Sequence, residues 1–193
     1  FLTRGVPGTH DIGLINKIFT KLKKKNFKTV LIPKFDKSID NRIKKSKWMK
    51  VKNQPNIIIF EGWCIGARSQ KNNRLKKSLN IVESKHDADL KWRKEVNYYL
   101  STSYRKLFDK IDKLIYLKAP SFNYIFQWRL LQEQKLKLTS KNKKIMSRSK
   151  VKEFIMFYER ITRQMMKDYS KISDITVFLD KKHRSTNMRL FRK

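Results

Sequence analysis

The sequence is poor in residues that form disulfides or that interrupt helices and strands. Its 193 residues include one cysteine, 5 glycines and 4 prolines. The single cysteine, Cys64, excludes an internal disulfide framework and is typical of a reducing compartment such as the cytoplasm. Few glycines and prolines, with 39% hydrophobic and 12% aromatic residues, exclude a disordered chain and favour one domain with a sizeable core.

Long apolar runs are also missing. Unbroken apolar runs such as residues 57–60 are far too short to cross a bilayer, so we expect neither a transmembrane helix nor a membrane partner. The chain opens on Phe1 and shows no signal-peptide pattern. We therefore expect it to be a piece of a longer polypeptide.

Acidic residues are scarce, with 16 Asp and Glu against 48 Lys and Arg, and the net charge is +32. This charge suggests nucleic acid, but each half of the chain carries +16, and no basic arm stands apart from a neutral body. Lysine predominates over arginine, although base readout favours arginine. We expect no specific nucleic-acid partner and a general attraction for small anions, including phosphorylated metabolites.

The spacing of apolar residues predicts an α/β fold with a mainly parallel sheet. Helices are predicted over residues 12–22 with Asp11 as N-cap, about 89–108, from 121 onward, and 151–169 with Ser147 or Ser149 as N-cap. Strands are predicted at 29–32, at 57–60 with both faces buried, at 114–117 and at 175–179. Segments 34–54, 66–88 and 139–146 read as loops, and residues 181–193 as a basic tail after a single domain over 1–180.

Glu61 directly follows the predicted strand at 57–60. An acidic residue at the carboxyl end of a strand in an α/β sheet lies where such folds bind ligands, and in phosphotransferases it commonly serves magnesium. A turn or helix-capping carboxylate is an equally good interpretation of Glu61.

Two further segments carry candidate binding residues. In the loop at 4–11, Arg4 can grip a carboxylate, and His10 and Asp11 can bond substrate hydroxyls, while exposed N–H groups can hold an anion. A structural turn with Asp11 as N-cap is the somewhat stronger interpretation. The third candidate is Asp36 after the strand at 29–32, since a carboxylate there can deprotonate a hydroxyl near the cations Lys37 and Arg42. A surface turn with solvated charges explains that segment equally simply.

Arg129 continues the apolar stripe of the helix that begins near residue 121. A cation there can swing over a phosphoryl group, although Glu133 at i+4 allows an ordinary helical ion pair. The three histidines lack metal-ligand spacing, and Cys64 is more typical of a small buried residue than of a nucleophile.

Several strings together resemble the P-loop glycerate kinases of the plant and cyanobacterial type, which are related to uridine kinase, phosphoribulokinase and pantothenate kinase. The resemblance covers nearly the whole chain, and its two longest strings are unusual. The matching strings are RGVPGTHD at 4–11, IPKFDKS at 32–38, EGWCIGAR at 61–68, LN at 79–80, WRKEVN at 92–97, LKAPSFNYIFQWRLLQE at 117–133 and FYERITRQM at 157–165.

This resemblance implies a P-loop three-layer sandwich that phosphorylates D-glycerate to 3-phosphoglycerate with ATP and Mg²⁺, a step of photorespiration in plants. It implies that Glu61 serves the metal, directly or through water, and that Arg129 is a lid arginine that also contacts ATP. It places the glycerate side of the cleft on the loops at 4–11 and 35–42. The candidate residues there are Arg4, His10, Asp11, Asp36, Lys37 and Arg42.

One departure from the family pattern stands out. The family's Walker A loop, G-x-x-x-x-G-K-[ST], does not occur in these 193 residues, and neither does the acidic segment on the next strand. We expect the missing first strand to lie between the strand ending at residue 60 and the strand at 114–117. We therefore expect this chain alone to be inactive and marginally stable.

Three rival interpretations stay open at this point. One is another small-molecule kinase of the uridine kinase and pantothenate kinase group. Another is a basic nucleic-acid-binding module. The third is a split or decayed kinase that pairs with a partner chain. The sequence alone sets no oligomeric state.

Overall fold

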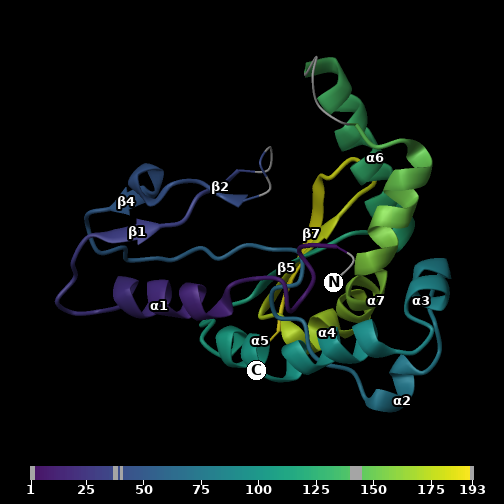
Figure 1. Ribbon diagram of the computed structural model, residues 1–193, viewed down its shortest axis with the longest axis horizontal. Helices are drawn as coiled ribbons and strands as arrows, with labels where there is room; N and C mark the ends of the chain where they lie inside the picture. The colour runs from purple at the N-terminus through teal and green to yellow at the C-terminus, as the bar shows by residue number, and fades with distance from the viewer. Residues whose placement is uncertain (1–2, 37–38, 40, 140–144, 192–193) are drawn as a thin grey trace. The chain divides into compact units, whose positions relative to one another are not determined.

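The computed structural model describes residues 3–36, 39, 41–139 and 145–191. The chain forms two compact units, a smaller one of residues Asp11–Glu61 and a larger one of the residues up to His10 and from Gly62 onward. The helices (Figure 1) are α1 (Ile12–Leu22), the 3-10 helix η1 (Lys45–Lys47), α2 (Asn72–Leu75), α3 (Ile81–His86), α4 (Lys91–Ser101), α5 (Ser103–Phe108), α6 (Phe122–Thr139) and α7 (Arg148–Ile172). The strands are β1 (Val30–Ile32), β2 (Phe35–Asp36), β3 (Asn41–Arg42), β4 (Met49–Val51), β5 (Ile115–Lys118), β6 (Ile175–Leu179) and β7 (Ser185–Leu190).

The smaller unit begins with α1, as the sequence predicts. The side chain of Asp11 accepts a hydrogen bond from the backbone N–H of Leu14 and so caps the helix. Strand β1 is also confirmed, and it pairs antiparallel with β4. The prediction that residues 34–54 are irregular is wrong for β2, β3, η1 and β4. The three strands form by pairing with other strands of the unit, which local periodicity does not reveal.

The strand predicted at residues 57–60 does not form. These residues are in no sheet within the described part of the chain, and the side chains of Ile57 and Ile59 are 79% and 87% exposed. The apolar run suits a strand with both faces covered, but no described strand pairs with it. The expectation of a doubly buried strand is therefore wrong for this chain as it stands.

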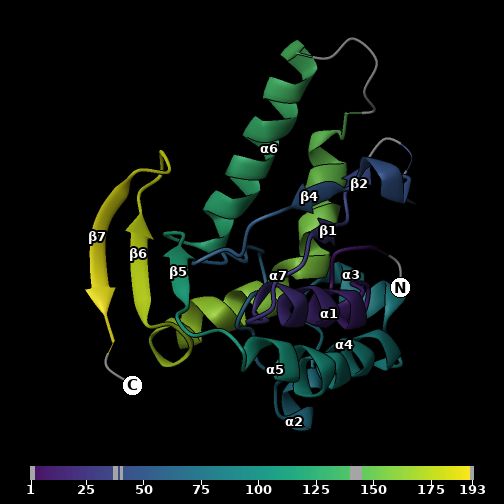
Figure 2. The same cartoon turned by 90° about the vertical axis from the view of Figure 1, so that its left-hand side faces the viewer.

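The sheet of the larger unit has the order β5-β6-β7 (Figure 2). Strands β5 and β6 are parallel, whereas β7 is antiparallel to β6. Both parallel strands were predicted, and β6 has the predicted bounds. The predicted basic tail at 181–193 instead contains β7, whose six residues are all exposed. Since the other described pairs are antiparallel too, the sheets are small and mixed, and a mainly parallel sandwich is not observed.

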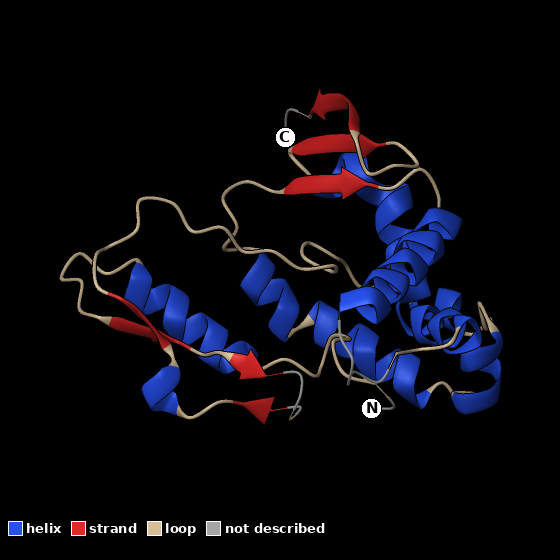
Figure 3. Ribbon diagram, turned by 90° about the horizontal axis from the view of Figure 1, so that it is seen from above, coloured by secondary structure: helices blue, strands red, loops and turns tan. Residues whose placement is uncertain are grey.

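Helices cover one side of this sheet, with α7 packed against β5 and α6 against α7 (Figure 3). Ser147 caps α7 by accepting from the N–H of Lys150, which confirms one of the two predicted caps. The helix predicted at about 89–108 is broken at Thr102 into α4 and α5, and the predicted loop at 66–88 contains α2 and α3. None of the helices in the described residues is both long and apolar enough to cross a membrane.

The other face of the sheet carries two apolar rows. Register places Ile115, Ile175 and Leu190 in one row and Leu117, Val177 and Met188 in the next, all on the same face. The four side chains that β5 and β7 contribute to these rows are 58–72% exposed, whereas Thr176 on the opposite face of β6 is buried. A contiguous apolar surface of this kind favours association, because its burial releases ordered water.

We predict that this apolar face makes the isolated 193-residue chain self-associate and bind a hydrophobic dye. Leu117→Lys or Met188→Lys places a charge in the middle row and should lower dye fluorescence and shift the sedimentation profile toward monomer. Leu138→Lys is the matched control, because Leu138 is 87% exposed on α6 and lies outside the rows. A monomeric wild-type chain that does not bind the dye would contradict the prediction.

Candidate functional site

The loop of residues 3–10 is a closed turn. Gly5 and Gly8 have φ of +87° and +106°, a backbone conformation that glycine adopts without strain. The N–H of Gly5 donates to Thr9 Oγ1 at 2.8 Å, and the N–H of Gly8 donates to Tyr104 Oη at 3.0 Å. Because internal partners take these two N–H groups, they are not open to an anion, and the structural-turn interpretation holds for them.

Aromatic side chains from two other segments hold this loop in place. Trp63 Nε1 donates to the carbonyl of Gly5 at 2.7 Å, and the hydroxyl of Tyr158 donates to the carbonyl of Arg4 at 2.9 Å. The rings of Trp63 and Tyr158 meet edge to face, with centroids 4.9 Å apart. The string EGWCIGAR therefore contributes to the structure of the loop through Trp63.

The rest of that string packs into the larger unit. Cys64 is 4% exposed, and burial raises the pKa of its thiol to about 12. Gly66 has φ of +81°, and a Cβ there would lie 2.4 Å from Cδ2 of Leu114, just before β5. Another residue at Gly66 would be strained at this φ and would displace the Leu114 side chain, so the backbone conformation favours glycine there.

His10 is the predicted site residue with the most defined surroundings. Its Nδ1 lies 2.6 Å from Tyr104 Oη, and the imidazole keeps an exposed edge. Desolvation of the remainder of the ring lowers the pKa of His10, which favours the neutral imidazole near pH 7.

In the smaller unit the structure brings two predicted residues together. Arg42 Nη1 lies 3.2 Å from Asp11 Oδ2, and both side chains are about half exposed. Asp11 thus caps α1 and pairs with Arg42, a surface ion pair that contributes little stability in water. Asp36 lies in β2, opposite Asn41. Lys37 lies outside the described residues.

Glu61 is exposed. Among the described residues no group of three or more His, Cys, Asp or Glu side chains could hold a metal ion. Magnesium commonly uses one or two carboxylates and keeps its other positions for water and substrate phosphate. The chemistry of Glu61 therefore fits a magnesium ion held mainly by a nucleotide, and the described residues form no cage of their own.

Arg129, on α6, makes the ordinary helical pair that the sequence allowed. Its Nη2 contacts Glu133 Oε1, its Nη1 donates to Gln132 Oε1 at 2.8 Å, and its guanidinium lies 5.5 Å from the ring centroid of Phe154. Glu133 is 3% exposed and also accepts from the N–H of Met146. Arg129 is thus held between α6 and α7, with about a quarter of its side chain exposed.

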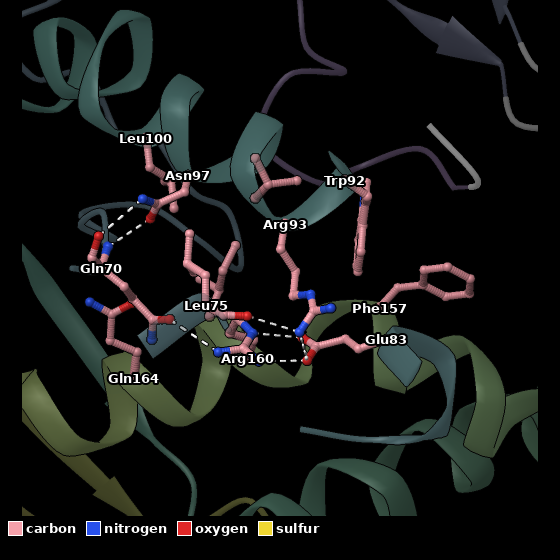
Figure 4. A pocket seen from close by; sticks show the side chains of 12 residues that line it. Gln70, Leu75, Glu83, Trp92, Arg93, Asn97, Leu100, Phe157, Arg160 and Gln164 are labelled. Carbon is pink, nitrogen blue, oxygen red and sulfur yellow. Dashed lines mark hydrogen bonds and ion pairs between the residues drawn. The ribbon is translucent and has the colours of Figure 1, made fainter. Parts of the chain in front are cut away.

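A buried charge network, which the sequence does not predict, lies between α3, α4 and α7 (Figure 4). Arg93 Nε donates to Asp87 Oδ2 at 2.6 Å, and Arg160 Nε donates to Glu83 Oε1 at 2.6 Å. Arg93 Nη1 also lies 3.7 Å from Glu83 Oε2. The side chains of Arg93, Asp87 and Glu83 are each 1–2% exposed, so these charges depend on one another.

Backbone groups complete the network. Asp87 accepts from the N–H groups of Trp92 and Arg93 at the start of α4. Arg93 and Arg160 donate to the carbonyls of Leu75, Asp87, Arg74 and Lys77. These contacts fix α2 and α3, the segment that the sequence analysis read as a loop.

One sequence signal could have revealed this region. Asn80 accepts from the N–H of Glu83, and Glu83 accepts from the N–H of Leu79, which is close to a capping box. The spacing Asn80-x-x-Glu83 therefore marks the start of α3. Asn80 also donates to Glu159, which joins the LN and FYERITRQM strings.

The network lines a small pocket together with apolar and amide side chains of α4 and α7. Its volume of about 20 Å³ suffices for a water molecule. Pockets that take metabolites or nucleotides are on the order of 300 Å³ or more. Trp92, whose buried Nε1 has no hydrogen-bond partner in the described structure, belongs to its lining. In this structure the pocket is therefore too small for a metabolite or a nucleotide.

Curated relatives of the chain are kinases. "Uncharacterized kinase mug58" of Schizosaccharomyces pombe is 34% identical over 161 residues, 80% of this chain and 56% of that protein. "Probable ATP-dependent kinase TDA10" of Saccharomyces cerevisiae is 29% identical over 180 residues, 86% of this chain and 57% of that protein. "D-glycerate 3-kinase, chloroplastic" of Arabidopsis thaliana is 26% identical over 166 residues, 80% of this chain and 32% of that protein.

The chain thus spans little more than half of the first two relatives, and no protein-family model matches it. Among solved structures, D-glycerate 3-kinase from Cryptococcus neoformans aligns with 97% of this chain and 69% of its own, with a TM-score of 0.76 at 22% identity. The fold is therefore the α/β fold of that kinase. Since the relatives include fungal and plant proteins, the similarity does not single out the plant type.

We predict that Arg93→Ala lowers the free energy of unfolding by about 3–5 kcal/mol, because it leaves the buried carboxylate of Asp87 without its cation and Glu83 with Arg160 alone. Lys94→Ala, at the exposed next position of α4, should change it by less than about 0.5 kcal/mol. Urea unfolding followed by circular dichroism measures both. Equal midpoints for the two variants would show that the network does not support the fold.

We also predict that Cys64 is inert in the folded chain. Its thiol is buried and its pKa is raised to about 12, so little thiolate exists at pH 8. A thiol reagent should react slowly in buffer and rapidly in urea, and Cys64→Ala, which has no thiol, gives the background reaction. Fast modification of the native chain at pH 8 would contradict this prediction.

Proposed function

We propose that the chain is the larger part of a small-molecule kinase that transfers the γ-phosphoryl group of ATP to the 3-hydroxyl of D-glycerate. The observation that carries the proposal is the agreement of fold over 97% of the chain with a D-glycerate 3-kinase, supported by kinase relatives over 80% or more of its sequence. The strings RGVPGTHD and EGWCIGAR add to it.

In this proposal the cations and carboxylates have different roles in phosphoryl transfer. Arg129 leaves Glu133 and Gln132 to stabilise the charge on the transferring phosphoryl group and so also contacts ATP. Glu61 holds magnesium, directly or through water, and the ion neutralises charge on the nucleotide phosphates when it is bound. Asp36 accepts or orients the proton of the attacking hydroxyl.

The carboxylate and hydroxyls of D-glycerate require donors. We assign Arg4 to the carboxylate and His10 to a hydrogen bond with substrate, with Asp11, Lys37 and Arg42 as further candidates. Arg42 already pairs with Asp11, but that pair uses one nitrogen of its guanidinium fork. The remaining donors of Arg42 can serve a substrate while the pair persists.

A phosphate-cradling loop has to come from polypeptide outside these 193 residues. No Walker A string occurs here. The apolar face of β5-β6-β7 and the exposed side chains of Ile57 and Ile59 fit a fold that takes further elements. We therefore propose that the chain alone does not turn over ATP, and ATPase and glycerate-kinase assays on it test this.

Another small-molecule kinase of the same fold is the second candidate, because the 34% identical relative is named only as a kinase. A substrate panel of D-glycerate, uridine and pantothenate with labelled ATP separates the two. Phosphorylation of D-glycerate alone supports the proposal, and phosphorylation of uridine or pantothenate instead replaces it.

We predict that Arg129→Ala, in a protein that carries its phosphate loop, lowers kcat by a factor on the order of 10³ and changes the KM for glycerate little. The physical reason is that Arg129 meets charge that develops only in the transition state. Lys137→Ala, at an exposed position of the same helix, is the control. An unchanged kcat in Arg129→Ala would remove this residue from the mechanism.

A further inference from the structure

Tyr104, on α5, joins two parts of the loop 3–10 through one hydroxyl group. The residue is 2% exposed, and burial raises the pKa of its phenol to about 12. Its Oη accepts the N–H of Gly8 at 3.0 Å and lies 2.6 Å from Nδ1 of His10. The hydroxyl is therefore protonated at neutral pH and has two partners on the loop.

The direction of the second hydrogen bond follows from counting protons. A phenol has one proton to donate, and the backbone N–H of Gly8 can act only as a donor. In the described structure no other acceptor lies within hydrogen-bond distance of the Tyr104 hydroxyl, and a buried donor without an acceptor costs about 1–3 kcal/mol. The proton therefore goes to Nδ1 of His10, which must be the unprotonated nitrogen of the ring.

We propose that Tyr104 is a positioning residue that fixes His10 as the Nε2–H tautomer and thereby makes the exposed Nε2–H of His10 a hydrogen-bond donor to the substrate. Nε2 has no hydrogen-bond partner within the described part of the chain, and His10 as a whole is an exposed residue. A neutral donor bonds a carboxylate or hydroxyl oxygen. It does not remove a proton from a substrate hydroxyl, so His10 is a donor and not the general base.

The identity of the acceptor rests on the proposed function, in which D-glycerate supplies a carboxylate and hydroxyls. The tautomer and the hydrogen bond to Tyr104 do not rest on it. The two claims can therefore be tested separately on the 193-residue chain.

The test uses the full chain with ¹⁵N-labelled histidine, which gives three side chains to observe. His10→Gln identifies the signals of His10. In the wild-type chain we expect an unprotonated, hydrogen-bonded Nδ1, a protonated Nε2 and a Tyr104 hydroxyl proton that is protected from exchange and correlated with Nδ1. In Tyr104→Phe we expect the hydroxyl proton to vanish, Nδ1 to shift to the position of a free nitrogen, and the Nδ1–H tautomer to rise.

Tyr98→Phe is the matched control, since Tyr98 is 60% exposed on α4 and its hydroxyl is not a partner of Tyr104 or His10. It should leave the ¹⁵N shifts of His10 in place. A protonated Nδ1 in the wild-type chain would overturn the proposal, and so would His10 signals that Tyr104→Phe leaves unchanged. If Tyr104→Phe does not fold, the wild-type spectrum still decides, through the presence or absence of the hydroxyl proton bonded to Nδ1.

Addition of D-glycerate to the same samples tests the acceptor. We expect the Nε2–H resonance of His10 to shift in the wild-type chain, and the affinity from that shift to fall several-fold in Tyr104→Phe. If the chain has the expected tautomer but its Nε2–H resonance does not shift on addition of D-glycerate, the assignment of His10 to this substrate is overturned. The positioning by Tyr104 would then stand on the tautomer data alone.

Discussion

A charge network of the buried Arg93 and the partly buried Arg160, between α3, α4 and α7, is the constraint on which the larger unit depends. Arg93 and Arg160 bring their charges to Asp87 and Glu83, and their remaining donors go to backbone carbonyls of the segment 74–87. Charges that are this buried are tolerated only with their partners in place. The network therefore sets the positions of three helices at once.

The position of the loop 3–10 follows from these helices. Helix α7 carries Arg160 and, two residues earlier, Tyr158, whose hydroxyl holds the carbonyl of Arg4. Helix α4 carries Arg93 and leads into α5, which presents Tyr104 to Gly8 and His10. The strings that resemble the glycerate kinases thus contain two kinds of residue. Those at 79–80 and 92–97, and part of that at 157–165, build the support, and those at 4–11 include the groups proposed to meet the substrate.

The sequence predicted the elements whose signal is local. Helix α1 has its cap and apolar stripe within twelve residues, and β6 is a short β-branched run with sharp ends. The strands that the sequence did not predict share one cause. Strand β4 is stabilised by pairing with β1, and β7 by pairing with β6. The prediction for residues 57–60 was wrong for the opposite reason. This run has the composition of a strand, but no described strand pairs with it. Local composition shows which apolar side chains a segment could bury. It does not show whether other strands or helices are present to cover them.

The contacts of the candidate site also fall into local ones, which the sequence indicates, and distant ones, which it does not. The Asp11 cap and the Arg129–Glu133 pair were visible as spacings of a few residues, and the structure contains both. The bond between His10 and Tyr104 joins residues 94 positions apart, and the pair of Glu83 and Arg160 joins residues 77 apart. No spacing in one sequence predicts such contacts, although the Asn80-x-x-Glu83 cap marked one end of the second.

The α3–α4–α7 network supports the fold, and we propose that ligands bind elsewhere. Hydrogen exchange with and without D-glycerate and a non-hydrolysable ATP analogue tests this most directly, on a protein that combines this chain with a phosphate-binding loop. We expect increased protection in the loop 3–10 and around Arg129, with the amides of residues 80–97 unchanged. Protection that changes chiefly at residues 80–97 would contradict it.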